Sequence, residues 1–398
     1  MTAVRPVRSK GEVKGIGDSS SGSQFNRNGK TYATDVKLGV AAAVVDGLLV
    51  RGDVEVDDGR IVAVGLPGGR SGLAIPGLVD LQVNGFRGID VLQATSDEIL
   101  ALGVELARSG VLWYQPTLIT APAELTRLAL ATIGSSSGGP GARILGAHLE
   151  GPFLSPERAG AHPAALLREP DLDLLASFLV AGCAVSTVTL APELPRAGEL
   201  IDGLVGRGIT VSLGHTDATA VVAHAAFDQG ALTVTHLFNA MRPFGHRDPG
   251  VVGAALARSD VIVQLIADGV HLAPEAILTA WRAARGRIAL VSDAIPAGGL
   301  GDGAFRVGTV DVTVENGVSR LANGTLAGAV RPLAWGLRML VEIGVPIVEA
   351  VDAVTRTPAR VVGRDDIALL RPGAPADLVV LDDDFARRTV LLGGSPVD

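Results

Sequence analysis

Three residues with metal-ligand chemistry stand at or just after short apolar runs. Glu150 follows ARILGAHL, His215 follows TVSLG, and His236 lies within TVTHLF. One carboxylate and two imidazoles are a common ligand set of catalytic zinc, which keeps one position open for water. Such a metal lowers the pKa of water toward neutrality and polarises a carbonyl group. The three residues therefore predict a metal-dependent hydrolase, although a single histidine at a strand end is more often a hydrogen-bonded structural residue.

A fourth candidate, Asp293, directly follows the apolar run IALVS. Beside a metal, its carboxylate could take a proton from the attacking water and return it to a leaving amine. The alternative is a structural aspartate that caps the following helix. Five of the seven histidines are predicted on the same rim: His148, His162, His215, His236 and His271. This clustering favours the catalytic interpretation.

Eight apolar runs rich in β-branched residues recur along the middle of the chain, with stretches of helical spacing between them. The runs cover 77–83, 111–118, 142–149, 184–191, 210–214, 233–238, 261–267 and 288–292. Near-continuous apolar strands that alternate with helices indicate a parallel sheet covered on both faces. Eight such units over about 220 residues fit a TIM-like (β/α)8 barrel, whose active sites lie at the C-terminal ends of the strands. The candidate residues occupy those ends.

The two ends of the chain differ from this middle. Short β-like runs separated by Gly and Asp turns fill residues 38–75, and similar runs (ADLVVLD, RRTVLLGG) return in 366–398. We therefore predict an α/β fold in which a barrel over 76–365 carries a small discontinuous β-sandwich domain formed by both chain ends. Residues 1–37, which contain GDSSSGS and few apolar side chains, are predicted to be a flexible tail.

Lysine is confined to the tail, because Lys37 is the last of only four in the chain. The folded body therefore has no Schiff-base lysine, no P-loop lysine and no carboxylated lysine to bridge two metals. The net charge is −8, and residues 1–37 carry seven basic and three acidic side chains, which leaves −12 for the remainder. This acidic body argues against nucleic-acid and anionic-membrane partners.

The single cysteine, Cys183, excludes a disulfide framework and fits a reducing cytoplasm. The N-terminus lacks the pattern of a secretory signal, so a cytoplasmic location is expected. The uncharged stretch 174–192 is long enough to span a bilayer. Its first half has helical spacing and its second half is β-branched, which favours a buried helix-to-strand passage. No membrane partner is therefore expected.

Six motifs follow one another along the chain: PGLVDLQVNG (76–85), HLEGPF (148–153), SLGHTDAT (212–219), THLFNAM (235–241), ADGVHLAPE (267–275) and LVSDAIPAGG (290–299). Together they closely resemble the N-acetylglucosamine-6-phosphate deacetylases, a family of the amidohydrolase superfamily. The resemblance runs from about residue 40 to the end. It implies hydrolysis of the acetamide of N-acetyl-D-glucosamine 6-phosphate to D-glucosamine 6-phosphate and acetate, in amino-sugar catabolism or cell-wall recycling.

The resemblance also assigns roles to individual residues. It places the metal on Glu150, His215 and His236. It makes Asp293 the general base and acid, and it implies that His162 contacts the acetamido group and helps to polarise its carbonyl. The implied substrate-binding residues are Ala161, His162, Asn239, Ala240, Arg247, His271, Leu326, Ala327 and Gly328. The Arg247 equivalent contacts the sugar phosphate across a dimer interface, which implies a homodimer. A surface ion pair is the alternative for Arg247.

Two departures from related sequences bear on these expectations. Many amidohydrolases carry His-x-His at the end of the first strand to hold a second metal, where this chain has Gln82-Val-Asn84, as one branch of the deacetylases does. Amide side chains are poor metal ligands, so we expect one divalent metal per subunit. Zn²⁺ is the expected ion, with Fe²⁺, Co²⁺ or Mn²⁺ as alternatives. Ala161 stands where relatives often have Thr, which affects only a minor sugar contact.

Two other functions remain open. A metal-dependent deacetylase or amidohydrolase of another N-acyl sugar or amino acid would use the same residues, and indifference to the phosphate would favour it. A non-catalytic barrel that serves as a binding or scaffold protein would be expected to lack a ligand or the acid–base group. The three candidate ligands and the acid–base candidate are all present in the chain: Glu150, His215, His236 and Asp293.

Overall fold

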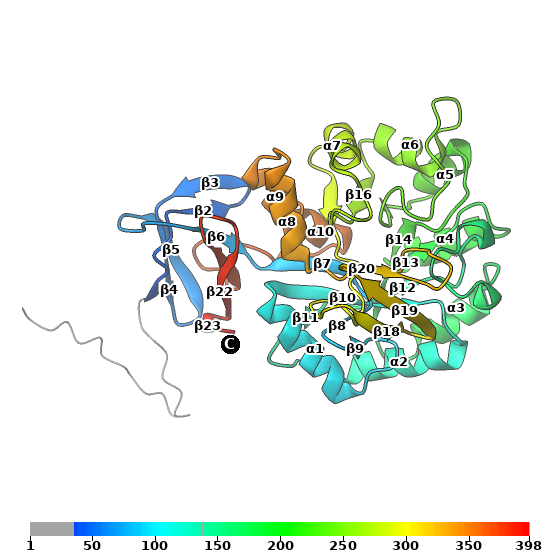
Figure 1. Cartoon of the computed structure of the whole chain (residues 1–398), viewed down its shortest axis with the longest axis horizontal. Coiled ribbons are helices and arrows are strands. Elements are labelled where there is room, and N and C mark those ends of the chain that lie inside the picture. The colour runs from blue at the N-terminus through cyan, green and yellow to red at the C-terminus, as the bar shows by residue number, and fades with distance from the viewer. Residues whose placement is uncertain (1–35, 137, 398) are drawn as a thin grey trace, which may run out of the picture.

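The computed structural model describes residues 36–136 and 138–397, which form a barrel and a smaller β-sandwich (Figure 1). The predicted tail lies outside the described residues except for its last two, which form strand β1 (Val36–Lys37) of the sandwich. The two ends of the described chain, blue and red in Figure 1, meet in that sandwich.

Eight parallel strands form the barrel, and they coincide with the eight predicted runs. They are β7 (Leu78–Val83), β10 (Val111–Ile119), β12 (Ala147–Glu150), β13 (Val185–Leu190), β14 (Thr210–Leu213), β15 (Thr233–Val234), β16 (Ile262–Leu265) and β17 (Ile288–Leu290). Each pairs in parallel with the next along the chain. A parallel bridge between Val83, the last residue of β7, and Ala294, beyond the end of β17, closes the barrel. The prediction of a TIM-like barrel is confirmed.

Helices follow the strands and cover the outside of the barrel (Figure 1). They are α1 (Ser96–Arg108), α2 (Ala123–Ser135), α3 (Leu172–Leu179), α4 (Ala197–Val205), α5 (Ala220–Asp228), α6 (Gly250–Ala257), α7 (Pro274–Ala283), α8 (Leu333–Glu342), α9 (Ile347–Asp352) and α10 (Arg356–Val361). Helix α1 shows how the sequence determines where such a helix begins and which of its faces is buried. Thr95 and Glu98 form a reciprocal capping box at its start. Ile99, Leu102 and Leu106 recur at helical spacing and are buried against the barrel.

The uncharged stretch 174–192 divides as predicted. Its first part lies in α3 and its second part contains β13, a barrel strand, with a short turn between the two. Among the described residues, no helix combines the length and the apolar character needed to cross a bilayer. Within this stretch, β13 is almost wholly buried in the barrel, whereas Val180 in the turn before it is exposed.

The sandwich consists of two sheets. One contains β1, β4 (Asp53–Asp57) and β5 (Arg60–Leu66). The other has the order β23 (Ser395–Pro396), β22 (Arg387–Leu392), β21 (Leu378–Leu381), β6 (Leu73–Pro76), β2 (Ala42–Val45) and β3 (Leu48–Arg51). Antiparallel pairing of β6 with β21 joins the two ends of the chain directly. Val54, Ile61, Leu378 and Val380 are buried in the core between the sheets.

A three-stranded antiparallel sheet between β17 and α8 was not predicted. It contains β18 (Gly303–Val307), β19 (Val310–Glu315) and β20 (Val318–Arg320). The sequence carries its signals, since VDVTVE alternates apolar and polar residues and an Asn-Gly pair marks the second turn. Val312 and Val314 of β19 pack on Ile295, beside the barrel mouth. Shorter elements are β8 (Gly85–Phe86), β9 (Ile89–Asp90), β11 (Arg143–Ile144) and single 3₁₀ turns at Pro156–Arg158 and Ala164–Leu166.

Candidate active site

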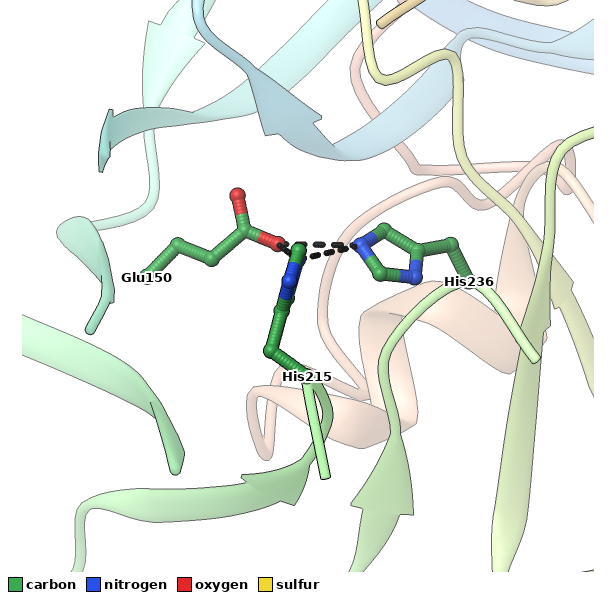
Figure 2. A group of neighbouring side chains, drawn as sticks. All are labelled: Glu150, His215 and His236. Atoms are coloured by element: carbon green, nitrogen blue, oxygen red, sulfur yellow. Dashed lines mark hydrogen bonds and ion pairs between the residues drawn. The ribbon is translucent and has the colours of Figure 1, made fainter. Parts of the chain in front are cut away.

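The three predicted metal ligands lie together at the C-terminal ends of the barrel strands. Glu150 is the last residue of β12, and His215 and His236 each lie two residues beyond their strands, β14 and β15. Their side chains point toward one another in Figure 2. Glu150 Oε1 is 3.1 Å from His236 Nε2 and 3.3 Å from His215 Nε2, and the two Nε2 atoms are 3.1 Å apart. All three side chains are buried, and their candidate ligand atoms lie within 4.8 Å of one another.

The backbone is strained where it presents these side chains. The φ angle is +49° at His215, +30° at His236 and +51° at Asp293. Residues other than glycine rarely adopt positive φ, and such conformations persist only where the surrounding structure fixes them. The strand ends therefore hold the polar groups of the mouth in defined positions.

The donor atoms of this cluster fit a divalent cation. His215 Nδ1 donates to the backbone oxygen of Arg158 over 3.0 Å, so its Nε2 keeps a free lone pair for a ligand bond. Burial alone would raise the pKa of Glu150, but its contacts with the imidazoles of His162, His215 and His236 hold that pKa well below its ordinary value. The carboxylate is thus ionised. An anionic oxygen and two imidazole nitrogens suit Zn²⁺ and other first-row ions.

Asp293 lies three residues beyond β17 and lines the same cavity. Burial, reinforced by the negative charge of Glu150, raises the pKa of Asp293 to about 6. Asn84 Nδ2 donates to Asp293 Oδ1 over 2.8 Å. A carboxyl group whose pKa is close to neutrality can both accept and return a proton, which is the property an acid–base group needs.

Two amides near the end of β7 each donate to one carboxylate of the mouth. Gln82 Nε2 is 3.0 Å from Glu150 Oε1, and Asn84 holds Asp293 as described above. The carbonyl oxygens of both amides are buried and have no hydrogen-bond partner among the described residues. Asn84 lines the cavity, whereas Gln82 lies behind Glu150. Both amides therefore act as donors to carboxylates in this arrangement.

His162 approaches the other carboxylate oxygen of Glu150, with its Nε2 3.7 Å from Oε2, and its ring centroid is 4.4 Å from that of His215. The backbone N–H of Thr120 donates to His162 Nδ1 over 3.2 Å, so the ring proton is on Nε2. Burial first, and then the neighbouring His215, lowers the pKa of His162 to about 4. The ring is therefore neutral near pH 7 and presents an N–H donor that can polarise a carbonyl oxygen.

The mouth contains a cavity of about 320 Å³, within the size range of small-molecule sites. Most of the predicted substrate-binding residues line it: Ala161, His162, Asn239, Ala240, His271, Leu326, Ala327 and Gly328. His271 Nδ1 is 2.8 Å from Asp268 Oδ2, a contact that fixes the imidazole ring within the wall. Arg247 is exposed and does not line the cavity of this chain.

His148 differs from the other histidines of the predicted rim. It precedes Glu150 by two residues on β12, so the two side chains share one face of the strand, but His148 lies deeper in the barrel. Its Nε2 is 2.7 Å from Thr189 Oγ1 and its Nδ1 is 3.2 Å from Thr117 Oγ1. Burial lowers the pKa of His148 to about 4. This histidine belongs to the hydrogen-bonded barrel interior below the site.

An apolar wall of the cavity was missed by the sequence interpretation. It contains Ile119, Ile266 and Ile295 from the barrel and Val307, Val310, Val312 and Leu321 from the unpredicted three-stranded sheet and the segment that follows it. The strand alternation and the Asn-Gly turn were available as signals for that sheet. Its position over the mouth was not, because no local pattern specifies where an inserted sheet packs.

A sequence model of the amidohydrolase family matches residues 73–397. The chain belongs to the amidohydrolase family. Within it, the chain is 41% identical over 347 residues to the human N-acetylglucosamine-6-phosphate deacetylase and 40% identical over 348 residues to the rat enzyme of that name. Each alignment covers 83% of this chain and 84% of the relative. An N-acetylgalactosamine-6-phosphate deacetylase from Escherichia coli O157:H7 is 37% identical, with 81% of this chain and 87% of the relative covered.

Solved structures of deacetylases have the same fold as this chain. A mutant N-acetyl-D-glucosamine-6-phosphate deacetylase from Mycobacterium smegmatis, in complex with N-acetyl-D-glucosamine-6-phosphate, has a TM-score of 0.86 and 36% identity. The match covers 92% of this chain and 99% of that one. The deacetylase from Thermotoga maritima has a TM-score of 0.81 and 30% identity, over 91% and 99% of the two chains. The likeness therefore extends over the barrel and the sandwich together.

Proposed function

We propose that this amidohydrolase is a deacetylase that hydrolyses the acetamide of N-acetyl-D-glucosamine 6-phosphate to D-glucosamine 6-phosphate and acetate. The observation that carries the proposal is the buried mouth in which the cluster of Glu150, His215 and His236 faces the same cavity as Asp293 and His162. Relatives at about 40% identity carry the name of this activity, which supports the choice of substrate.

In the proposed mechanism, Glu150, His215 and His236 would hold one divalent metal. When bound, such a metal lowers the pKa of water and polarises a carbonyl oxygen. His162 donates its Nε2 proton toward the acetamide oxygen and stabilises the negative charge that develops there. Asp293 accepts a proton from the attacking water and then delivers it to the sugar nitrogen, so that the C–N bond breaks with release of acetate.

The remaining lining residues are proposed to bind the sugar phosphate. His271 is the candidate for contact with the phosphate, because Asp268 fixes its ring and leaves Nε2 free. Asn239, Ala240, Ala161 and the segment 326–328 are candidates for contact with the sugar. Arg247 would reach the phosphate only across a dimer interface, and we therefore propose a homodimer in which each subunit supplies this residue to its partner.

The expected metal is one Zn²⁺ per subunit, with Fe²⁺, Co²⁺ or Mn²⁺ as alternatives, since a Glu/His/His set accepts all of them. We propose that the enzyme works in the cytoplasm, in amino-sugar catabolism or cell-wall recycling. A second candidate substrate is N-acetyl-D-galactosamine 6-phosphate, because a relative at 37% identity is named for its deacetylation.

Acetate release measured on matched substrates tests the proposal. The metal-loaded chain should hydrolyse N-acetyl-D-glucosamine 6-phosphate with a kcat/KM well above that for the galactose epimer and for unphosphorylated N-acetyl-D-glucosamine. Preference for the epimer would support the second candidate. Equal rates with and without phosphate would indicate an N-acyl hydrolase of a different kind, and no release from any of the three would overturn the proposal.

A further inference from the structure

We infer that Asn84 is a positioning residue that orients the Asp293 carboxyl group and leaves one of its oxygens free for proton transfer. The inference rests on the proposed deacetylation and deepens it, because it assigns a role to a residue that the mechanism above does not use. It also explains why an amide can stand where related amidohydrolases carry a metal-binding histidine.

Asn84 and Asp293 meet where the barrel closes. The backbone N–H of Asn84 donates to Ala294 O over 2.8 Å, next to the bridge between Val83 and Ala294. The backbone oxygen of Asp293 in turn accepts the N–H of Ala329 over 2.9 Å. Both side chains therefore project from backbone that is fixed by hydrogen bonds, and their contact does not depend on a free loop.

The atoms in contact define the orientation of both groups. A carboxylate can only accept hydrogen bonds, so Asn84 must present its NH₂ group to Asp293 Oδ1, at 2.8 Å. The other carboxylate oxygen, Oδ2, lies toward Gly328, where an added Cβ atom would be 3.8 Å from it. Gly328 lines the cavity. The hydrogen bond therefore engages the oxygen away from Gly328 and leaves Oδ2 for the reacting groups.

This orientation leaves Asn84 Oδ1 without a hydrogen-bond partner in the described part of the chain, although the residue is only 4% exposed. An unpaired buried carbonyl costs folding free energy, which an apolar side chain of similar size would avoid. Stability therefore does not account for an amide at this position, whereas the N–H contact to Asp293 does. Gln82 makes the corresponding contact to Glu150 and also has an unpaired oxygen, so the two amides hold one carboxylate each.

A double-mutant cycle on the metal-loaded full chain tests this role. Asn84→Ala should lower kcat for N-acetyl-D-glucosamine 6-phosphate by about 10-fold to 100-fold, since a charge-assisted contact is lost and the base is misplaced. KM and metal content should stay as in the wild type. In an Asp293→Asn background, Asn84→Ala should have almost no further effect, because a residue that acts only through Asp293 has nothing left to position.

Two further variants keep the test decisive. Asn84→Leu keeps a side chain of similar size but removes the donor, so it should also lose kcat, even if Asn84→Ala fails to fold. Gln264 is the matched control: it is a buried barrel amide whose Oε1 is also unpaired, but its Nε2 contacts Thr233 outside the cavity. Gln264→Ala should leave kcat unchanged.

The outcomes separate the two levels of the proposal. A wild-type kcat in folded Asn84→Ala, an equal loss in both backgrounds of the cycle, or a loss confined to KM or to metal content would each overturn the role of Asn84 while the deacetylase activity stands. Absence of acetate release from the wild type would overturn the proposed function and this inference together.

Discussion

Buried carboxylates occur in both the sandwich and the barrel mouth, but their surroundings differ. In the sandwich, Asp53 Oδ1 accepts the backbone N–H groups of Val40 at 3.0 Å and Val54 at 2.8 Å. At the junction of the sandwich with the barrel, the Arg143 guanidinium donates to Asp377 Oδ2 over 2.7 Å. Backbone N–H groups and an arginine donate hydrogen bonds to these carboxylates. Their burial therefore stabilises the fold.

The buried carboxylates in the mouth of the barrel have different surroundings. Asp293 is buried near Glu150, and its pKa is raised to about 6 by burial and by that neighbouring charge. Three buried polar atoms there have no hydrogen-bond partner within residues 36–136 and 138–397, namely Gln82 Oε1, Asn84 Oδ1 and His236 Nδ1. The difference indicates that the sandwich uses buried polarity for structure, whereas the mouth holds polar groups for a ligand. Substitutions in the mouth should therefore change activity, and substitutions in the sandwich should change stability.

The largest effect is expected for His236→Ala. Loss of one of three ligands should leave the purified protein with little metal and lower acetate release by about 10³-fold or more, because the metal supplies both the water and the carbonyl polarisation. Metal analysis beside the rate measurement checks this. His224→Ala, on helix α5, is the control and should retain both. Full metal content together with full activity in His236→Ala would refute the ligand assignment.

Asp293→Asn should lower kcat by about 10² to 10⁴-fold, the range that an acid–base group supplies. The metal should remain bound, and the melting temperature should not fall, because the variant removes a charge from a buried site. Rate, metal content and thermal unfolding measured on one preparation separate these effects. Retained turnover would show that another group carries the proton.

His271→Ala should raise KM for the phosphorylated substrate by about 10-fold to 100-fold, since one donor to the phosphate is lost. The rate on unphosphorylated N-acetyl-D-glucosamine should change little. A comparable loss on both substrates would instead point to a role near the acetamide.

Asp53→Ala tests the sandwich side of the comparison. It removes the acceptor of two buried N–H groups, and the free energy of unfolding should fall by about 1–3 kcal/mol. Because Asp53 is remote from the cavity, kcat of the folded protein should be unchanged. Denaturant unfolding and the acetate assay measure the two quantities. Asp384→Ala, an exposed aspartate of the same sandwich, should alter neither.

The smallest effect is expected on deletion of residues 1–35. All the proposed site residues lie between Gln82 and Gly328, and the sandwich begins at Val36. Both kcat and the melting temperature should match the full chain. A large loss of either would show that the deleted segment contributes to the fold or the site.

The sequence predicted the barrel and its chemistry because both depend on local patterns. Six of the eight β-branched runs are directly followed by a polar residue. The topology of a parallel barrel brings strand ends together without knowledge of any contact. The sheet over the mouth and the pairing of Asn84 with Asp293 could not be predicted in this way. They depend on where distant segments pack, and an amide in a sequence does not show which carboxylate it will meet.

The bonds from Gln82 and Asn84 span 68 and 209 residues of chain, respectively. During synthesis, the ribosome therefore adds Glu150, His215 and His236 to the chain well before Asp293. A nascent chain that stops between residues 237 and 292 already contains every proposed metal ligand, yet it lacks the proton carrier and the Ala294 bridge that closes the barrel. Long-range contacts of this kind form only after the intervening chain is ordered. The proposed proton carrier and the residue that closes the barrel are thus added to the chain one after the other.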